Sequence, residues 1–306
     1  MNSAIKCPSF EEYVSQGAKP RSRLNVNESV EFAHPIDATI IKVLDNKLIN
    51  ELFSKYVGAC VDLTEGLALA SSIKVDENSQ PELYAVLNEC ADKLGIDVPY
   101  TVISRSVPGI NAQTVGTDEF SYIAISSLLN MLLSVEEQKF VLGHECGHVA
   151  LGHVVYHTAL RTIGNFGNLI PVVGAAIAAT IQYPLNAWSR KSEISADRAG
   201  LICCGDVATA KKALLKLEAG FMNIDKLDVD DYLENTRKFR QGNALGKFTE
   251  LFYEHPIIPK RMEALDLFAN SEKYYRISGQ EIPEGKRLLS DKELEKRTNE
   301  IIKILL

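Results

Sequence analysis

Two histidines four residues apart, with a glutamate beside the first, are the part of this sequence best suited to chemistry. His144, Glu145 and His148 form an HExxH motif in a helix-forming segment. On a helix, positions four apart lie one above the other, so both imidazoles can reach one metal ion. Glu145 projects about 100° further round the helix, where it can take a proton from an attacking water molecule. The motif predicts a catalytic zinc site with Glu145 as the general base.

A catalytic zinc ion needs a third protein ligand, and the sequence offers two candidates. His153 resembles the last histidine of the metzincin pattern HExxHxxGxxH, but the glycine and the histidine are both displaced by one position. With no helix break expected before it, His153 would lie about 140° from the face of the ligands. Glu193 is the better candidate, because it lies on a separate predicted helix, with Asp197 one turn later. Asp197 is then placed to accept a hydrogen bond from a ligand imidazole.

Each of these residues also has a purely structural interpretation. The motif histidines could simply hydrogen-bond on one face of a helix, and Glu193 with Asp197 could form a solvated acidic face. The small and uncharged neighbours of Glu193 favour the ligand role. His153 and His157 are predicted to pack, or to hydrogen-bond to the ligands, rather than to bind a second metal ion.

Three motifs, in this order, resemble the M48 family of gluzincin zinc peptidases, which includes the HtpX-like enzymes. They are HECGH at 144–148, SEISADRAG at 192–200, and His255-Pro256 followed by Arg261. In addition, NAQTVG at 111–116 matches the NAxxxG strand that precedes the active-site helix of this family. The resemblance covers about residues 100–267, and the first hundred residues carry no comparable signature.

The resemblance implies a role for the residues of the first two motifs. His144, His148 and Glu193 would bind one Zn²⁺ ion per chain. Glu145 would be the general base, and Asp197 would hydrogen-bond to a ligand histidine.

It also implies roles for residues around these motifs. His255 would lie near the metal, where it either stabilises the oxyanion of the tetrahedral intermediate or caps the site in a latent state. Arg261 would orient His255 or bind substrate carbonyls. The strand at 111–116 would pair with a substrate peptide through backbone hydrogen bonds, which makes Asn111 and Ala112 substrate contacts.

Charge and cysteine content limit the partners and the compartment. The chain has 306 residues, with 33 basic and 40 acidic side chains and a net charge of −7. This balance argues against a nucleic-acid partner and against attraction to an anionic membrane surface. The six cysteines form no CxxC pair, and the first twenty residues contain no apolar stretch typical of a secretory signal. These features favour a cytoplasmic protein.

The elements that must position the site are predicted from periodicity. A capping box at Ser134 and Glu137 begins the motif helix, which is expected to run to residue 158. The fold class is α+β: a mostly helical, zincin-like metallopeptidase with a small sheet beside the HExxH helix. Residues 1–99 are expected to pack as a helical and extended region on a catalytic domain formed by residues 100–306. The predicted helices are 35–57, 81–94, 127–133, 135–158, 186–204, 207–219, 230–240 and 260–270, and the predicted strands are 67–75, 100–104, 111–116 and 120–126.

An uncharged segment of 28 residues, 162–189, separates the two ligand helices. Its longest apolar run, 169–181, is shorter than the roughly 18–20 residues that a membrane span needs. We therefore favour a buried hairpin or a lid over a membrane span, with peripheral membrane contact as a secondary interpretation.

The sequence as a whole predicts a zinc metalloendopeptidase that hydrolyses unfolded or flexible polypeptides. One alternative is a latent or non-catalytic zinc-bound scaffold that holds peptides like a chaperone. Another is a membrane-associated quality-control protease.

Overall fold

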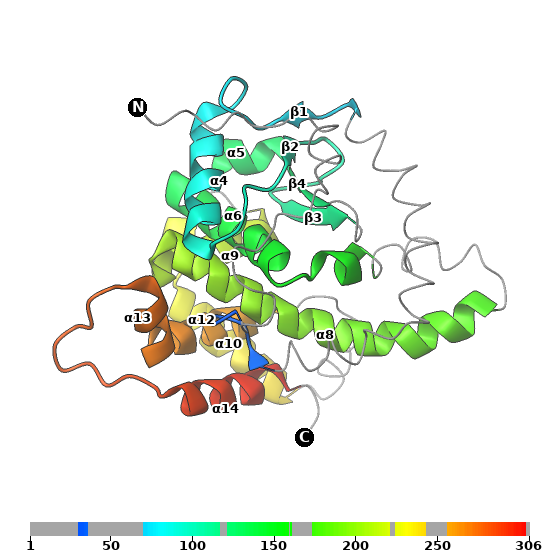
Figure 1. Ribbon diagram of the computed structural model, residues 1–306. Coiled ribbons are helices and arrows are strands. Elements are labelled where there is room, and N and C mark those ends of the chain that lie inside the picture. The colour runs from blue at the N-terminus through cyan, green and yellow to red at the C-terminus, as the bar shows by residue number, and fades with distance from the viewer. Residues whose placement is uncertain are drawn as a thin grey trace.

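A small sheet lies on one side of a long central helix, and shorter helices lie on its other side (Figure 1). The computed structural model describes residues 30–35, 70–116, 121–158, 160, 173–220, 224–242 and 256–303. The protein is mostly helical with one mixed sheet, which confirms the predicted α+β class.

The sheet has four strands in the order β1-β2-β4-β3. Strand β4 (Ser121–Ile125) pairs in parallel with β2 (Thr101–Ile103) and antiparallel with β3 (Ala112–Gly116), where Thr114 lies opposite Ile123. The short strand β1 (Ile73–Lys74) adds antiparallel to β2. All five side chains of β4 are buried, as expected for a central strand. Among the described strands only β4 pairs with β3, so β3 forms an edge of the sheet.

Helix α6 (Val135–Ala150) carries the HExxH motif beside this edge strand. Ser134 and Glu137 form the predicted capping box at its start. Helix α8 (Val173–Cys204) packs closely along α6, because α6 has glycines where the two helices meet. A Cβ atom on Gly143 would lie 2.6 Å from Cys203 Cβ, and one on Gly147 would lie 2.7 Å from Ala199 Cβ. These glycines allow α8 to bring its acidic residues to the motif histidines.

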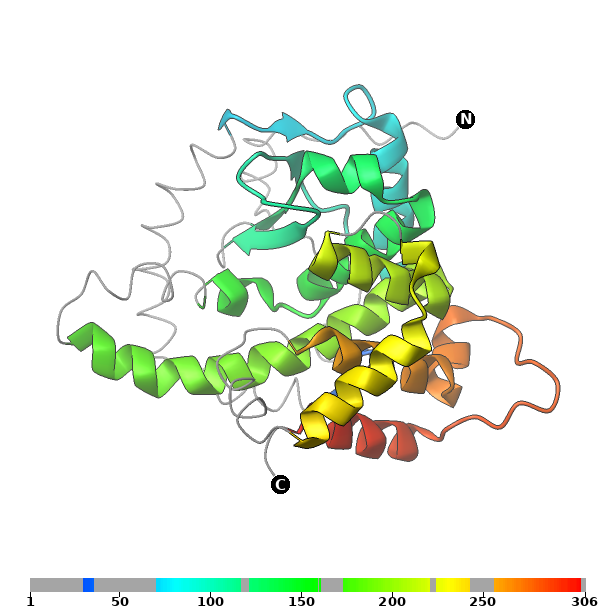
Figure 2. The same ribbon diagram turned by 180° about the vertical axis from the view of Figure 1, so that it is seen from behind.

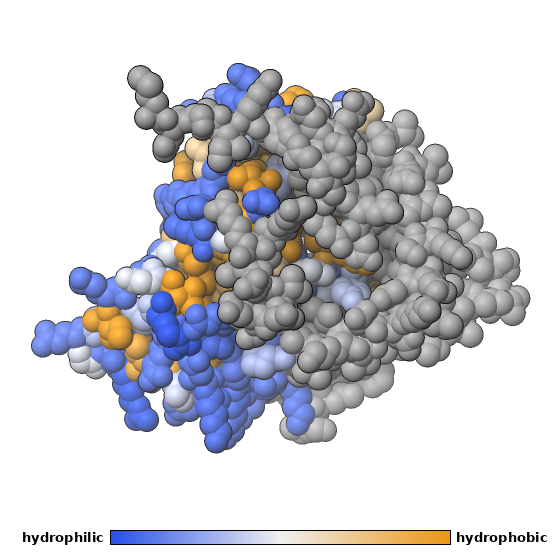
Figure 3. Space-filling model, in the orientation of Figure 1, coloured by the Kyte–Doolittle hydropathy of each residue, from blue (hydrophilic) through white to orange (hydrophobic). Residues whose placement is uncertain are grey.

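The remaining helices enclose the central pair. Helices α4, α6, α8, α9 and α12 share one apolar core, to which each fully buried leucine contributes about 1.5–3 kcal/mol. Seen from behind, α10 (yellow) crosses the opposite face (Figure 2). The outer face over α14 is hydrophilic (Figure 3), while its Leu294, Thr298 and Ile302 point inward. The bounds are α4 Pro81–Leu94, α5 Ser127–Leu132, α9 Val207–Ala219, η2 Ile224–Lys226, α10 Val229–Gly242, α12 Ile258–Ala269, α13 Glu272–Ser278 and α14 Asp291–Ile302.

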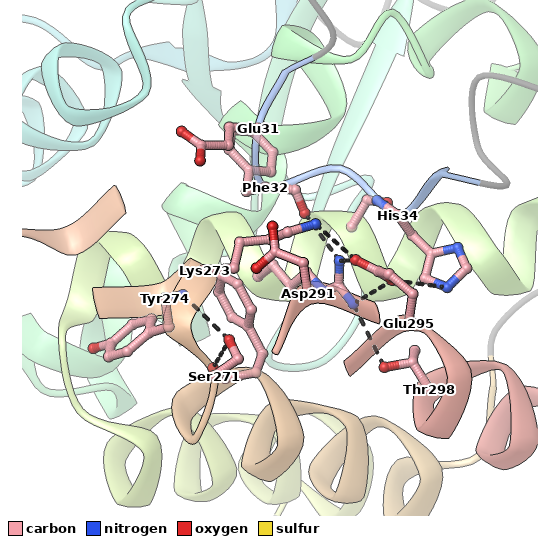
Figure 4. Close-up of polar contacts among 12 residues, drawn as sticks. Glu31, Phe32, His34, Ser271, Lys273, Tyr274, Asp291, Glu295 and Thr298 are labelled. Carbon is pink, nitrogen blue, oxygen red and sulfur yellow. Dashed lines mark hydrogen bonds and ion pairs between the residues drawn. The ribbon is translucent and has the colours of Figure 1, made fainter. Parts of the chain in front are cut away.

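An ionic cluster ties residues 30–35 to the helices behind the motif. The Arg198 guanidinium of α8 donates to both carboxylate oxygens of Glu295 at 3.0 and 3.1 Å. Lys273 Nζ donates to the same carboxylate at 2.7 Å, and His34 Nε2 lies 3.2 Å from it (Figure 4). Arg198 also donates to the backbone carbonyl of Phe32. The early segment 30–35 is thus held against α8 by residues of α13 and α14.

Most predicted elements are present, whereas four predictions need correction or stay untested. Helix α6 ends at Ala150 rather than at residue 158, and a second helical turn covers 154–158. Of the expected strand at 67–75, only β1 is a strand in the described part. The predicted helix at 35–57 falls almost wholly in residues that are not described, so it stays a prediction. The division of the chain at residue 99 stays a prediction as well.

The uncharged segment contributes residues 173–189 to α8, which continues as one helix to Cys204. Its earlier part, residues 162–172, lies outside the described residues, so the expected hairpin or lid stays a prediction. In the described part of the chain, no helix has both the length and the apolar character that a membrane crossing needs.

Candidate metal centre and active site

Three buried side chains from α6 and α8 point their donor atoms at one another. His144 Nε2 and His148 Nε2 are 3.1 Å apart, and they lie 3.5 Å and 3.3 Å from the two carboxylate oxygens of Glu193. A tetrahedral zinc ion with bonds of about 2.0–2.1 Å holds its ligand atoms about 3.3 Å apart. The donor set and its spacing therefore fit one zinc ion.

Burial and neighbouring charges shift the pKa values of the two motif histidines in opposite directions. Burial, followed by the neighbouring His144, lowers the pKa of His148, which favours the neutral imidazole. Burial also acts to lower the pKa of His144, but the carboxylates of Glu193 and Asp197 outweigh it and raise this pKa. A cation between the two Nε2 atoms would replace the proton that His144 otherwise attracts.

Asp197 fixes the ring of His144 from the side away from Glu193. Its Oδ1 lies 3.0 Å from His144 Nδ1. Burial raises the pKa of Asp197, but the Arg261 guanidinium outweighs this effect and keeps the pKa below its usual value. An ionised Asp197 accepts the Nδ1–H of His144, so the lone pair of this imidazole is on Nε2.

Arg261 of α12 directs its guanidinium to the two carboxylates of α8. Its Nε donates to Asp197 Oδ2 at 2.8 Å and its NH2 to Asp197 Oδ1 at 2.6 Å, while NH1 lies 3.4 Å from Glu193 Oε2. Arg261 also lines the cavity, and its predicted contact with His255 or with substrate stays a prediction, because His255 lies outside the described residues.

Glu145 is held by a residue that the sequence analysis did not select. Thr114 Oγ1 donates to Glu145 Oε2 at 2.5 Å, and both side chains are buried. Thr114 belongs to β3, so the edge strand orients the carboxylate next to His144. The sequence marked the strand at 111–116 but carried no signal that its fourth residue would reach Glu145.

A cavity of about 330 Å³ lies over these groups. The motif residues His144, Glu145 and His148 line it together with Glu193. The predicted substrate contacts Asn111, Ala112 and Arg261 also line it, as do Thr114 and the apolar side chains of Phe140, Val141, Leu217 and Ile258. His255 lies outside the described residues, whereas the next residue, Pro256, lines the cavity. The candidate metal ligands, Glu145 and the edge strand β3 thus line the same cavity.

His153 is not where the sequence analysis placed it. The expectation of an unbroken helix was wrong, because Gly152 adopts a positive φ of 69° directly after α6. The chain turns back, and His153 Nδ1 lies 3.0 Å from His148 Nδ1. A glycine just beyond the last turn of a helix is a common stop signal, so the sequence contained the information.

Comparisons with known proteins identify a peptidase family. A family model described as Peptidase family M48 matches residues 77–268. A protein named plastoglobule-localized metallopeptidase 48, chloroplastic, from Arabidopsis thaliana is 28% identical over 259 residues, which cover 80% of this chain and 74% of that protein. A protease HtpX homolog from Arthrobacter sp. (strain FB24) is 28% identical over 231 residues, covering 67% of this chain and 79% of that protein. No solved structure matches.

Proposed function

Since this chain belongs to peptidase family M48 and is therefore a metallopeptidase, we propose that it is a zinc-dependent endopeptidase. Its substrates would be unfolded or flexible polypeptides. One observation carries this proposal: donor atoms of His144, His148 and Glu193 meet within 3.1–3.5 Å in the cavity that Glu145 also lines. Three protein ligands leave a fourth position open, which is typical of catalytic rather than structural zinc.

Each residue of the candidate site has its own proposed role in hydrolysis. His144, His148 and Glu193 would hold a zinc ion, which when bound would act as a Lewis acid and lower the pKa of a water molecule toward about 7. Glu145 takes a proton from the attacking water and passes it to the nitrogen of the departing amine. Thr114 keeps the Glu145 carboxylate in place through its 2.5 Å hydrogen bond.

The edge strand supports an extended polypeptide as substrate. The side of β3 away from β4 pairs with no other described strand, and residues 111–114 line the cavity. A substrate segment added to this edge is held by backbone hydrogen bonds, which requires an unfolded or flexible chain. Asn111 and Ala112 are the residues that we assign to this pairing.

Three features of the function remain part of this proposal. His255 is assigned to stabilise the oxyanion or to cap the metal in a latent state; it lies outside the described residues, and the next residue, Pro256, lines the cavity. The protein works in the cytoplasm, with peripheral membrane contact through 162–189 as the secondary interpretation. The relative named for plastoglobules makes that contact worth testing by fractionation with and without detergent.

The experiment that tests the proposal compares the zinc-loaded protein with its Glu145→Gln variant. Both are incubated with a diverse mixture of unfolded peptides, and the products are identified by mass spectrometry. Cleavage by the wild type alone, with one zinc ion in each protein, is the expected result, because the variant loses only the base. Equal peptide binding without cleavage by either protein would instead favour the peptide-holding scaffold.

A further inference from the structure

The end of helix α6 brings a third histidine, His153, to the candidate metal centre. Gly152, with φ at 69°, reverses the chain in the left-handed conformation. The His153 N–H donates to the carbonyl of His148 at 3.0 Å, and the Gly152 N–H donates to the carbonyl of Val149 at 3.2 Å. These two bonds form a Schellman motif, which places the residue after the glycine over the residue five positions earlier. In this chain the two residues brought together are both histidines.

The two imidazoles meet through the ring nitrogens that face away from Glu193. His148 Nδ1 and His153 Nδ1 are 3.0 Å apart, so one donates and the other accepts. A His148 ring that offers its Nε2 lone pair to a metal carries its proton on Nδ1. His148 is therefore the donor and His153 the acceptor in the metal-binding state.

His153 is held rigidly enough for this role. It is fully buried, and its ring meets Trp188 of α8 edge to face at a centroid distance of 5.3 Å. Tyr156 and His157 contact the same indole at 5.2 and 4.9 Å. Trp188 lies on α8, which also carries Glu193. Helix α8 therefore carries the third proposed ligand and also packs against His153, the partner of His148.

We propose that His153 is a positioning residue that fixes the tautomer and the orientation of His148. This inference rests on the proposed function, because it assigns a partner to one of the proposed zinc ligands. It makes the centre asymmetric: an ion-paired carboxylate, Asp197, orients His144, whereas an imidazole orients His148. Metal-bound histidines depend on such partners, and loss of one weakens metal binding by about 10- to 100-fold.

A second metal site is the competing explanation for this histidine cluster. His148, His153 and His157 also lie close enough to hold an ion. However, His148 belongs to both groups, and its Nδ1 already lies at hydrogen-bonding distance from His153. Filling both sites together would require His148 to lose both ring protons. His157 Nε2 is engaged elsewhere, 2.9 Å from the hydroxyl of Ser192.

The test measures zinc affinity by competition with a chelator, together with the number of zinc ions per chain. His153→Phe keeps a ring against Trp188 but cannot accept the hydrogen bond, so we expect it to bind zinc about 10- to 100-fold more weakly. His153→Gln, whose amide oxygen can accept the bond, should recover most of the affinity. His157→Phe is the matched control, because it replaces an imidazole of the same cluster by a phenyl ring without removing the partner of His148 Nδ1.

Unchanged zinc affinity in His153→Phe would overturn the proposal, and so would an equal loss in His157→Phe. Two zinc ions in the wild type with one in His153→Phe would mean a second metal site.

If His153→Phe does not fold, Gly152 supplies the test, since a Cβ there meets no atom within 4 Å. Alanine at position 152 disfavours the left-handed turn, so Gly152→Ala must weaken zinc binding. Asparagine tolerates this conformation, so Gly152→Asn must leave zinc binding unchanged. A wild type without zinc would refute the proposed function itself, so the two failures are distinguishable.

Discussion

Replacing Thr114 with valine should slow hydrolysis while leaving substrate binding almost unchanged. The two side chains have nearly the same shape, so the substitution opens no cavity. It removes only the hydroxyl that donates to Glu145 Oε2 at 2.5 Å. The backbone of β3, which we expect to pair with the substrate, stays as it is. The effect should therefore fall on kcat rather than on KM.

The size of the effect follows from the burial of both groups. Thr114 is 3% exposed and Glu145 is 6% exposed, so the hydrogen bond between them is largely shielded from bulk solvent. A hydrogen bond to a charged group contributes about 1.5–3 kcal/mol. Because about 1.4 kcal/mol corresponds to a tenfold change in rate, kcat should fall about 10- to 150-fold.

The assay determines kcat and KM separately for the wild type, Thr114→Val and Thr114→Ser, using a peptide that the wild type cleaves. Serine keeps the hydroxyl, so this variant should retain most of the activity. Zinc content is measured in each protein to exclude loss of the metal. A valine variant with the kcat of the wild type would refute the reasoning, and so would a serine variant as slow as the valine one.

Two further predictions concern the framework of the site. Gly147→Ala places a Cβ 2.7 Å from Ala199 Cβ, so it should lower the free energy of unfolding by about 1–3 kcal/mol. Urea unfolding measures this change, and a midpoint equal to that of the wild type would contradict the close packing of α6 and α8. Glu295→Gln should reduce the dependence of stability on pH below about pH 4.3, the usual pKa of a glutamate. Burial raises the pKa of Glu295, but Arg198 and then Lys273 outweigh it and lower this pKa in the folded protein. The carboxylate therefore stabilises the fold above its unfolded pKa, and this stability is lost as the pH falls through the folded pKa. Urea unfolding between pH 3 and 7 tests this, and identical pH profiles for both proteins would contradict it.

The sequence predicts the parts of the site that depend on local spacing. A four-residue separation on a helix brings His144 and His148 together whatever surrounds them, and the same rule places Glu193 and Asp197 on one face. The capping box at Ser134 and the end of α4 at Leu94 likewise follow from adjacent residues. These features follow from helix geometry alone.

The sequence does not predict contacts that tertiary packing creates. Thr114 reaches Glu145 only because β3 lies beside α6, and nothing in the strand marks that residue. Arg261 was predicted from its motif, but its contacts with carboxylates depend on the packing of α12 against α8. His153 was misplaced for a different reason. The apolar pattern continues past Gly152, so the periodicity indicated an unbroken helix where the glycine ends it.

The ionic cluster around Glu295, next to helix α8, affects the order in which parts of the protein can fold during synthesis. Arg198, one residue after Asp197, is 1% exposed, and its carboxylate partner Glu295 comes 97 residues later in the chain. A buried cation without its partner costs about 3–5 kcal/mol, so α8 is poorly held until α14 has been made. Every residue assigned to the metal centre precedes α14, and none of them is contacted by Glu295 in the described structure. A growing chain therefore contains every residue of the candidate site before it contains the carboxylate that pairs with Arg198 of α8.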